Sequence, residues 1–337
     1  ESAFVNTVAK IARDIPGGDL INFGSGRDQV VRLVLRNCVL SHCRATGPSR
    51  DAIEEATGLH STAFPLAVGP QKLVIENCVF TYNSTRHIRF RGWGVPGHPE
   101  ATDFEIRNTV MYGAGLHAME SNFGPNPGVL RFQNVRVWGL PDVGPGGRVY
   151  SGDPDLFIAD LDDGIFVGGA ENVAISCGSD SGDVPTTGTW DRSTVIGGTG
   201  VVLGFGNGAD LRYVARDCVF GDRGTTPSAA FAGSGYSIRL DSCGVPDIGP
   251  SCLGEAGSQA ELGSGVVRAD PVFVNATGDA ASTDSVNLSP LAVASGESRE
   301  AEFWGVENGS PAPEGYADAS TTGSALGADR GSSEMRE

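Results

Sequence analysis

Three arginines stand close together in the stretch RHIRFR at residues 86–91. Arg86, Arg89 and Arg91 lie in a chain that carries 24 Lys and Arg against 41 Asp and Glu, a formal net charge of -17. This overall acidity argues against a surface that binds nucleic acid, but a local cluster of cations can still hold one acidic ligand. We therefore expect a local anion-binding site at these arginines.

The composition of the 337 residues indicates a turn-rich β protein. The chain contains 49 glycines and 19 prolines, and 39% of its residues are hydrophobic, which is too apolar for a disordered protein. No run approaches the roughly 18 apolar residues of a membrane span. We expect neither a membrane nor a nucleic acid among the partners of this chain.

Seven cysteines occur without any C-x-x-C pair, so their spacing is unlike that of a zinc site. Cys38, Cys78 and Cys218 hold the same place in a strand motif, which is typical of small buried hydrophobic residues. Cys243 and Cys252 lie in a segment rich in Gly and Pro and could form a disulfide.

One short pattern recurs along the chain without a strict period. It is seen in RLVLRNCVL (32–40), KLVIENCVF (72–80), DFEIRNTVM (103–111), VLRFQNVRV (129–137) and DLRYVARDCVF (210–220). Alternation with period two places Leu33, Leu73, Phe104 and Leu130 on one face of their strands. Asparagine follows at a constant offset, at positions 37, 77, 108 and 134.

Such a repeat predicts an all-β fold, a right-handed parallel β-helix (solenoid) in which equivalent side chains stack in ladders and the asparagines occupy successive corners. An antiparallel sandwich also has short strands, but it does not predict a recurrent strand–Asn–strand unit. Helical periodicity is weak, and residues 8–14 or 50–57 could supply a helical turn or two at most. We expect a β-helix domain over residues 1–300 and a loosely structured tail over 301–337.

The run from LINFGSGRDQVVRLVLRNCVLSHC through QKLVIENCVFTYNSTRHIRFRG to DFEIRNTVMYGAG resembles the pectate lyases. These are right-handed parallel β-helix enzymes that cleave polyuronates by β-elimination. The likeness covers about residues 15–170 and centres on the two arginines of Arg86-His87-Ile88-Arg89-Phe90-Arg91, with Ile88 where the family motif has proline.

The resemblance implies a role for each matching residue. Arg86 matches the catalytic base and Arg91 the arginine that holds a substrate carboxylate, while Arg89 and His60 would bind substrate nearby. Asp19 falls where the family places a calcium-binding acid. Asn22 and Asp14 are further metal ligands that this placement suggests. Cations and Ca²⁺ suit the reaction because removal of the C5 proton of a uronate builds negative charge on the adjacent carboxylate.

The resemblance thus predicts a secreted, monomeric polysaccharide lyase that uses Ca²⁺ to cleave an acidic, pectate-like polyuronate. The alternative is a non-catalytic β-helix that binds glycan or serves a surface structure, with its arginines paired to the many acids of the chain. The sequence begins ESAFVN, with neither an initiator Met nor a signal peptide, and this start is compatible with an export signal and further N-terminal coils upstream. Paired acids in LDDG (161–164) could act in a glycosidase, although acidic turns are common in so acidic a chain.

Overall fold

The structure is a computed structural model that describes a series of short segments. They are residues 2–5, 8–14, 21–25, 31–44, 57–63, 71–81, 83, 86–91, 102–112, 117–122, 128–138, 148–152, 156–167, 175–177, 186–196, 201–205, 211–221, 229–232, 236–245 and 259–268. The expected tail at 301–337 lies outside them.

The described strands form two sheets. The first, sheet A, has 18 strands. They are β1 (Ser2–Val5), β2 (Val8–Asp14), β4 (Val31–Arg36), β5 (Val39–Arg44), β7 (Gln71–Glu76), β8 (Val79–Thr81), β10 (Thr102–Tyr112), β12 (Gly128–Trp138), β14 (Leu156–Asp162), β15 (Ile165–Val167), β17 (Thr186–Asp191), β18 (Thr194–Ile196), β20 (Leu211–Arg216), β21 (Val219–Gly221), β23 (Tyr236–Asp241), β24 (Gly244–Val245), β25 (Gln259–Leu262) and β26 (Val267–Arg268).

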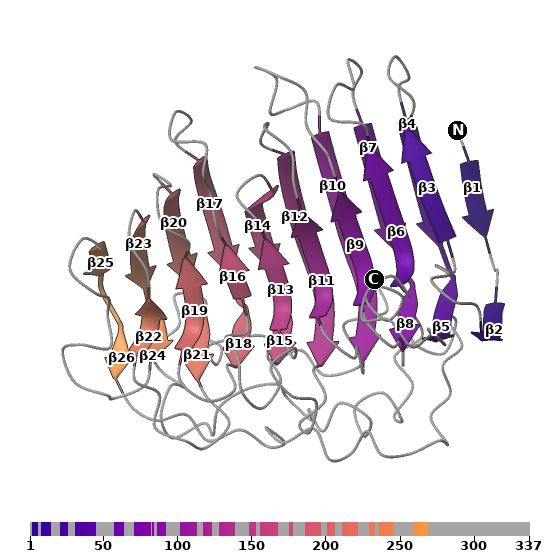
Figure 1. Ribbon diagram of the computed structural model, residues 1–337. Helices are drawn as coiled ribbons and strands as arrows, with labels where there is room; N and C mark the ends of the chain where they lie inside the picture. Colours follow the sequence, from indigo (N-terminus) through magenta and orange to yellow (C-terminus); the bar gives the residue numbers. More distant parts are fainter. Residues whose placement is uncertain are drawn as a thin grey trace.

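Sheet B has eight strands. They are β3 (Ile21–Ser25), β6 (Thr57–Ala63), β9 (Arg86–Arg91), β11 (His117–Asn122), β13 (Arg148–Gly152), β16 (Ile175–Cys177), β19 (Val201–Phe205) and β22 (Ala229–Ala232). Figure 1 shows the strands side by side in sequence order, from β1 at one end to β25 and β26 at the other.

Every pairing between described strands is parallel, as in β4 with β7, β7 with β10 and β10 with β12. The same holds in sheet B, where β6 pairs with β9 and β9 with β11. Parallel partners cannot be joined by a tight hairpin, because the chain must travel back before it pairs again. The described part is therefore all-β with parallel sheets, and the antiparallel sandwich is excluded for these strands.

The expected interior ladder is confirmed by the register. Leu33 lies beside Leu73, Leu73 beside Phe104, and Phe104 beside Leu130. All four are buried, with exposed fractions of at most 1%. A second ladder runs from Leu35 to Leu240 through the equivalent residues of the strands between them, one of which is the buried Trp190.

The expected corners are confirmed as well. Asn37, Asn77, Asn108 and Asn134 all have a positive φ, between 47° and 52°. Asparagine tolerates this left-handed conformation better than most residues, which explains its recurrence at the bends between β4 and β5, between β7 and β8, and within β10 and β12. The same conformation continues at Asp163, Arg192, Asp217 and Ser242.

Six of the eight residues that follow a corner carry a small hydrogen-bonding side chain and are buried. Cys38, Cys78, Cys218 and Cys243 donate through their S–H to the backbone carbonyl two residues earlier, over 3.2–3.3 Å. Thr109 and Ser193 make the equivalent bond through a hydroxyl over 2.9 Å. These bonds satisfy a carbonyl at the bend and fix the side chain against the core.

Two sequence-based expectations are wrong. Residues 8–14, where a helical turn was allowed for, form strand β2, because the register with β5 brings this segment into sheet A. Cys243 is a free buried thiol, so it is not bridged to Cys252; it sits in the ladder of small residues beside Cys218. The described part of the chain contains no helix that could cross a membrane.

Candidate functional site

Sheet B brings several of the predicted site residues into one row. Register pairs Asn22 of β3 with His60 of β6, His60 with Arg89 of β9, and Arg89 with Glu120 of β11. Neighbouring strands in a sheet lie about 4.8 Å apart, so these positions follow one another like rungs. Arg91 lies two residues along the same strand as Arg89, beside Thr62.

A buried carboxylate faces two of the arginines. Glu120 forms an ion pair with Arg86, and its Oε2 lies 3.5 Å from Nε of Arg89. The side chains of Arg86, Arg89 and Glu120 are only 6%, 9% and 12% exposed, respectively. Burial of charged groups is costly unless they are paired, so the carboxylate compensates the two guanidinium groups inside the fold.

A catalytic role for Arg86 beside Arg91 would need both side chains to open onto one exterior groove, and the buried Arg86 does not meet this requirement. A base beside Arg91 would need a bend in RHIRFR, whereas Arg86–Arg91 form the single strand β9. Arg86 has a relative exposure of 5%, because its guanidinium turns to the buried Glu120. Sequence reasoning missed Glu120; the signal available was the single acid of the strand HAMESN, three residues after His117.

The predicted metal ligands are not brought together by the described backbone. Asp14 ends β2 in sheet A, beside Arg44, whereas Asn22 lies in β3 of sheet B. Asp19 lies outside the described residues, as do the side chains of Asp14, Asn22, His60 and Arg91. Within the described residues no three His, Cys, Asp or Glu side chains form a group that could hold a metal ion.

Next to this row, a buried histidine forms part of sheet B. Nδ1 of His87 lies 3.0 Å from Nδ2 of Asn83, and the same amide donates to the carbonyl of Leu40 over 3.4 Å. Gly58, on the neighbouring strand, has no room for a side chain, because a Cβ there would come within 2.7 Å of the Asn83 amide. His87 is fully buried, so it packs in the interior and does not line an open cleft.

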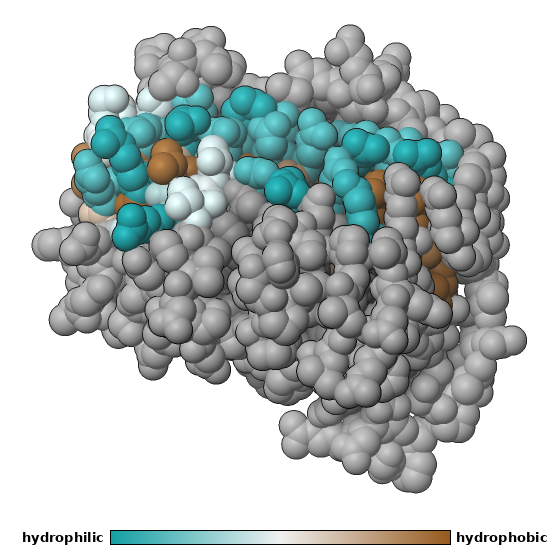
Figure 2. All heavy atoms as spheres, turned by 90° about the horizontal axis from the view of Figure 1, so that it is seen from above, coloured by the Kyte–Doolittle hydropathy of each residue, from teal (hydrophilic) through white to brown (hydrophobic). Residues whose placement is uncertain are grey.

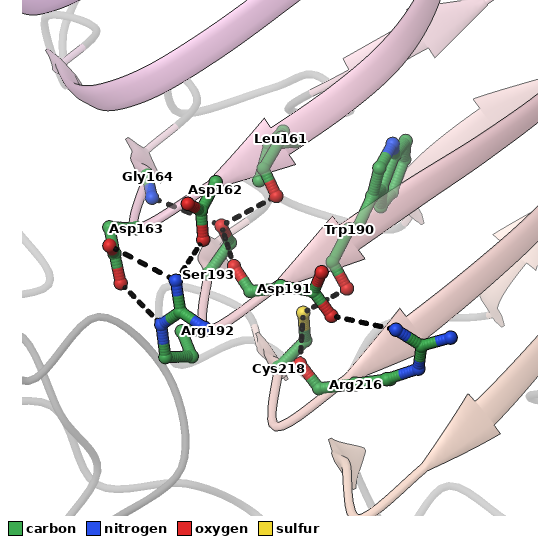
Figure 3. A network of polar contacts seen from close by, with 10 residues as sticks. All are labelled: Leu161, Asp162, Asp163, Gly164, Trp190, Asp191, Arg192, Ser193, Arg216 and Cys218. Atoms are coloured by element: carbon green, nitrogen blue, oxygen red, sulfur yellow. Dashed lines mark hydrogen bonds and ion pairs between the residues drawn. The ribbon is translucent and has the colours of Figure 1, made fainter.

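A second charged cluster lies at the corners of sheet A. Figure 3 shows Arg192 reaching back to the preceding unit, where it binds both Asp162 and Asp163. Nε of Arg192 donates to Oδ1 of Asp163 over 2.9 Å, and this bond with the carboxylate raises the pKa of Arg192. The acids of LDDG thus belong to an ion-pair network across a corner.

The same network extends to the following unit. Arg216 approaches Asp191 with 3.8 Å between Nη1 and Oδ1. Burial raises the pKa of the Asp191 carboxyl, and the positive charges of Arg216 and Arg192 oppose that rise. Ser193 lies beneath these charges, donates to the carbonyl of Asp191 and accepts a bond from the backbone N–H of Gly164 over 3.0 Å.

In both clusters, carboxylates compensate the positive charge of neighbouring arginines within the parallel sheets. Arg86 and Arg89 face the buried Glu120 in sheet B, and Arg192 and Arg216 face Asp162, Asp163 and Asp191 in sheet A. Comparison of the chain with protein-family models, with curated proteins and with solved structures gives no match.

Proposed function

We propose that this chain is a right-handed parallel β-helix that binds an acidic glycan without cleaving it. Parallel pairing in two sheets and corners that recur in register support the β-helix, and the crossover rule for parallel strands favours the right hand. The glycan follows from the resemblance to the pectate lyases, whose ligands are polyuronates.

The observation that carries the non-catalytic reading is the pairing of Arg86 with Glu120. A catalytic base must reach the proton of a bound substrate, so its side chain has to be accessible from the binding surface. The guanidinium of Arg86 is buried instead and forms an ion pair with the carboxylate of Glu120. The residue that matches the lyase base is thus engaged in an internal ion pair.

Two measurements on the same protein test the proposal. Calorimetric titration with polygalacturonate oligosaccharides measures binding, and ultraviolet absorbance of unsaturated uronides measures cleavage. We expect heat of binding without any rise in absorbance. Binding that is absent with every uronate polymer tested would overturn the proposal and leave a structural role for the fold.

A calcium-dependent polysaccharide lyase is the second candidate, because the register places Asn22, His60 and Arg89 on adjacent strands. In that case Arg91 and His60 would hold the substrate, and Ca²⁺ would act as a Lewis acid near Asp19, Asn22 or Asp14. Product absorbance that disappears with chelator and returns with added Ca²⁺ is the result that would establish it. Both candidates imply an extracellular protein, since polyuronates are extracellular polymers.

A further inference from the structure

An outward row of side chains runs along sheet A, one residue before each corner. Register joins its members in the order Arg36, Glu76, Arg107, Gln133, Asp162, Asp191, Arg216 and Asp241. We call this set the outer charge row. Its charged side chains keep between 21% and 53% of their surface exposed. Figure 2 shows a mainly hydrophilic band of described residues along one side of the molecule.

At three of the four correspondences, the charge in this row is opposite to the charge in the same row read backwards. Counted inward from the two ends, Arg36 corresponds to Asp241, Glu76 to Arg216, and Arg107 to Asp191. The two central positions, Gln133 and Asp162, pair a neutral residue with an acid. No charged position corresponds to one of the same sign.

The two flanking rows follow the same rule. Among the corner residues, the charged Asp163, Arg192 and Asp217 correspond to Asn134, Asn108 and Asn77. In the row two residues before the outer charge row, Arg131 corresponds to Asp160, and they already contact each other across neighbouring strands. These three rows thus bring no like charges together on reversal, whereas in the next outward row, further from the corners, Lys72 corresponds to Arg212. The opposite-sign correspondences outnumber this like-charge one.

We propose that two copies of this chain associate face to face through the outer charge row. A two-fold axis parallel to the strands, between Gln133 and Asp162, lays the row of one copy on the reversed row of its partner. Such a contact is isologous, so each opposition occurs twice. Complementary signs select this orientation, because like charges brought together at an interface are strongly unfavourable.

The surface is large enough for a stable contact. Eight strands at about 4.8 Å span roughly 34 Å, and six residues at about 3.3 Å give a strand of about 20 Å. The footprint is therefore about 700 Å² for each copy, and the roughly 1,400 Å² buried by both falls within the range of stable interfaces.

The ion pairs along the outer charge row within each chain are compatible with this contact between two chains. Nε of Arg36 lies 2.6 Å from Oε2 of Glu76, and Nε of Arg107 lies 3.1 Å from Oε1 of the same residue. A guanidinium has five N–H donors in one plane, so one bonded to its neighbour along the row can also donate outward. The exposed fractions of 49% for Arg36 and 53% for Arg216 leave them accessible from that side.

Charge reversal provides the test, with dimerisation followed by sedimentation equilibrium against the chain mass of 34.8 kDa. We expect the unmodified chain to form a dimer, and Arg36→Glu or Asp241→Arg alone to weaken dimerisation by about 100-fold, since each creates two repulsive contacts. An equimolar mixture of these two variants is expected to dimerise again, because a heterodimer pairs opposite charges at both contacts.

Arg36 and Asp241 lie seven strands apart, about 34 Å, so no effect within one chain restores association in the mixture. The matched control mixes Arg36→Glu with Asp191→Arg, which leaves two like-charge oppositions and is expected to stay monomeric. Far-ultraviolet circular dichroism checks the fold of each variant, and Arg107→Glu mixed with Asp191→Arg supplies a second complementary pair. A monomeric unmodified chain, or a complementary mixture that fails to associate, would overturn the proposal.

Discussion

Glu120 is the residue whose loss is expected to disturb the described fold most through charge. Replacement of Glu120 by Ala removes the carboxylate that faces both Arg86 and Arg89 in a buried setting. Breaking a buried pair in this way costs about 3–5 kcal/mol, because an uncompensated charge remains inside the protein. Urea unfolding measures the change. Glu105→Ala is the matched control: its ion pair with Arg107 is partly exposed, so a loss of at most about 1 kcal/mol is expected.

Asp191 gives the stability of the protein a dependence on pH. Burial raises its pKa in the folded state above the ordinary value of 3.8, so the folded chain holds this proton more tightly than the unfolded chain. The stability that this raised pKa contributes is therefore fully present below pH 3.8, and it is lost as the pH rises through the higher folded value. We expect the free energy of unfolding of Asp191→Asn, relative to the unmodified chain, to rise across that window. Urea unfolding at a series of pH values would contradict this if the difference stayed flat.

The stacked thiols should be inert while the protein is folded. A hydrogen bond with Cys38 and burial raise the pKa of Cys78, and burial together with a bond to Cys243 raises that of Cys218. Because the thiolate is the reactive form, alkylation by iodoacetamide at neutral pH is expected to spare these cysteines until denaturant is added. Mass spectrometry of digested protein locates the labelled sites, and rapid labelling of Cys78 or Cys218 without denaturant would refute the expectation.

At the scale of the elements, the corner residues hold the strands in register. Asn77 has a φ of 52°, a conformation that costs a residue with a Cβ about 1–2 kcal/mol and that Asn tolerates better than Ala. We expect Asn77→Ala to lower the free energy of unfolding by about 1 kcal/mol, and Asn77→Gly to change it little. Thermal and urea unfolding measure the free energy of unfolding of both variants, so that the two losses can be compared. Equal losses for Ala and Gly would mean that the amide side chain, not the backbone, matters at this corner.

The strands were predictable from the sequence because burial on one face imposes a period of two. Leu73 and Phe104 are therefore in the expected ladder, and Asn77 is at the expected corner. The corner at Arg192 was not predictable, since stacking on its neighbours imposes the positive φ on a residue that does not favour it. The same holds for the site. The burial of Arg86 depends on Glu120, which the register brings beside β9 from a later strand and which no local pattern marks.

At the scale of the whole molecule, the formal net charge of -17 opposes compactness. Salt screens this self-repulsion. Salt also weakens the exposed ion pairs, but each of these contributes little to the free energy of unfolding. We expect the urea midpoint of the monomeric Arg36→Glu variant to rise between about 0.05 and 1 M KCl. Sodium chloride as a second salt is the control for a specific ion effect. A midpoint that falls with both salts would show that ion pairs dominate over net repulsion.

The corner asparagines also separate distance along the chain from distance in space. Asn37, Asn77, Asn108 and Asn134 are 40, 31 and 26 residues apart in sequence, yet each belongs to the next rung of the same sheet. An insertion or deletion between rungs can therefore change what a connecting segment displays without moving the rungs on either side. The repeat therefore allows the segments between strands to change one at a time without altering the geometry of the outer charge row.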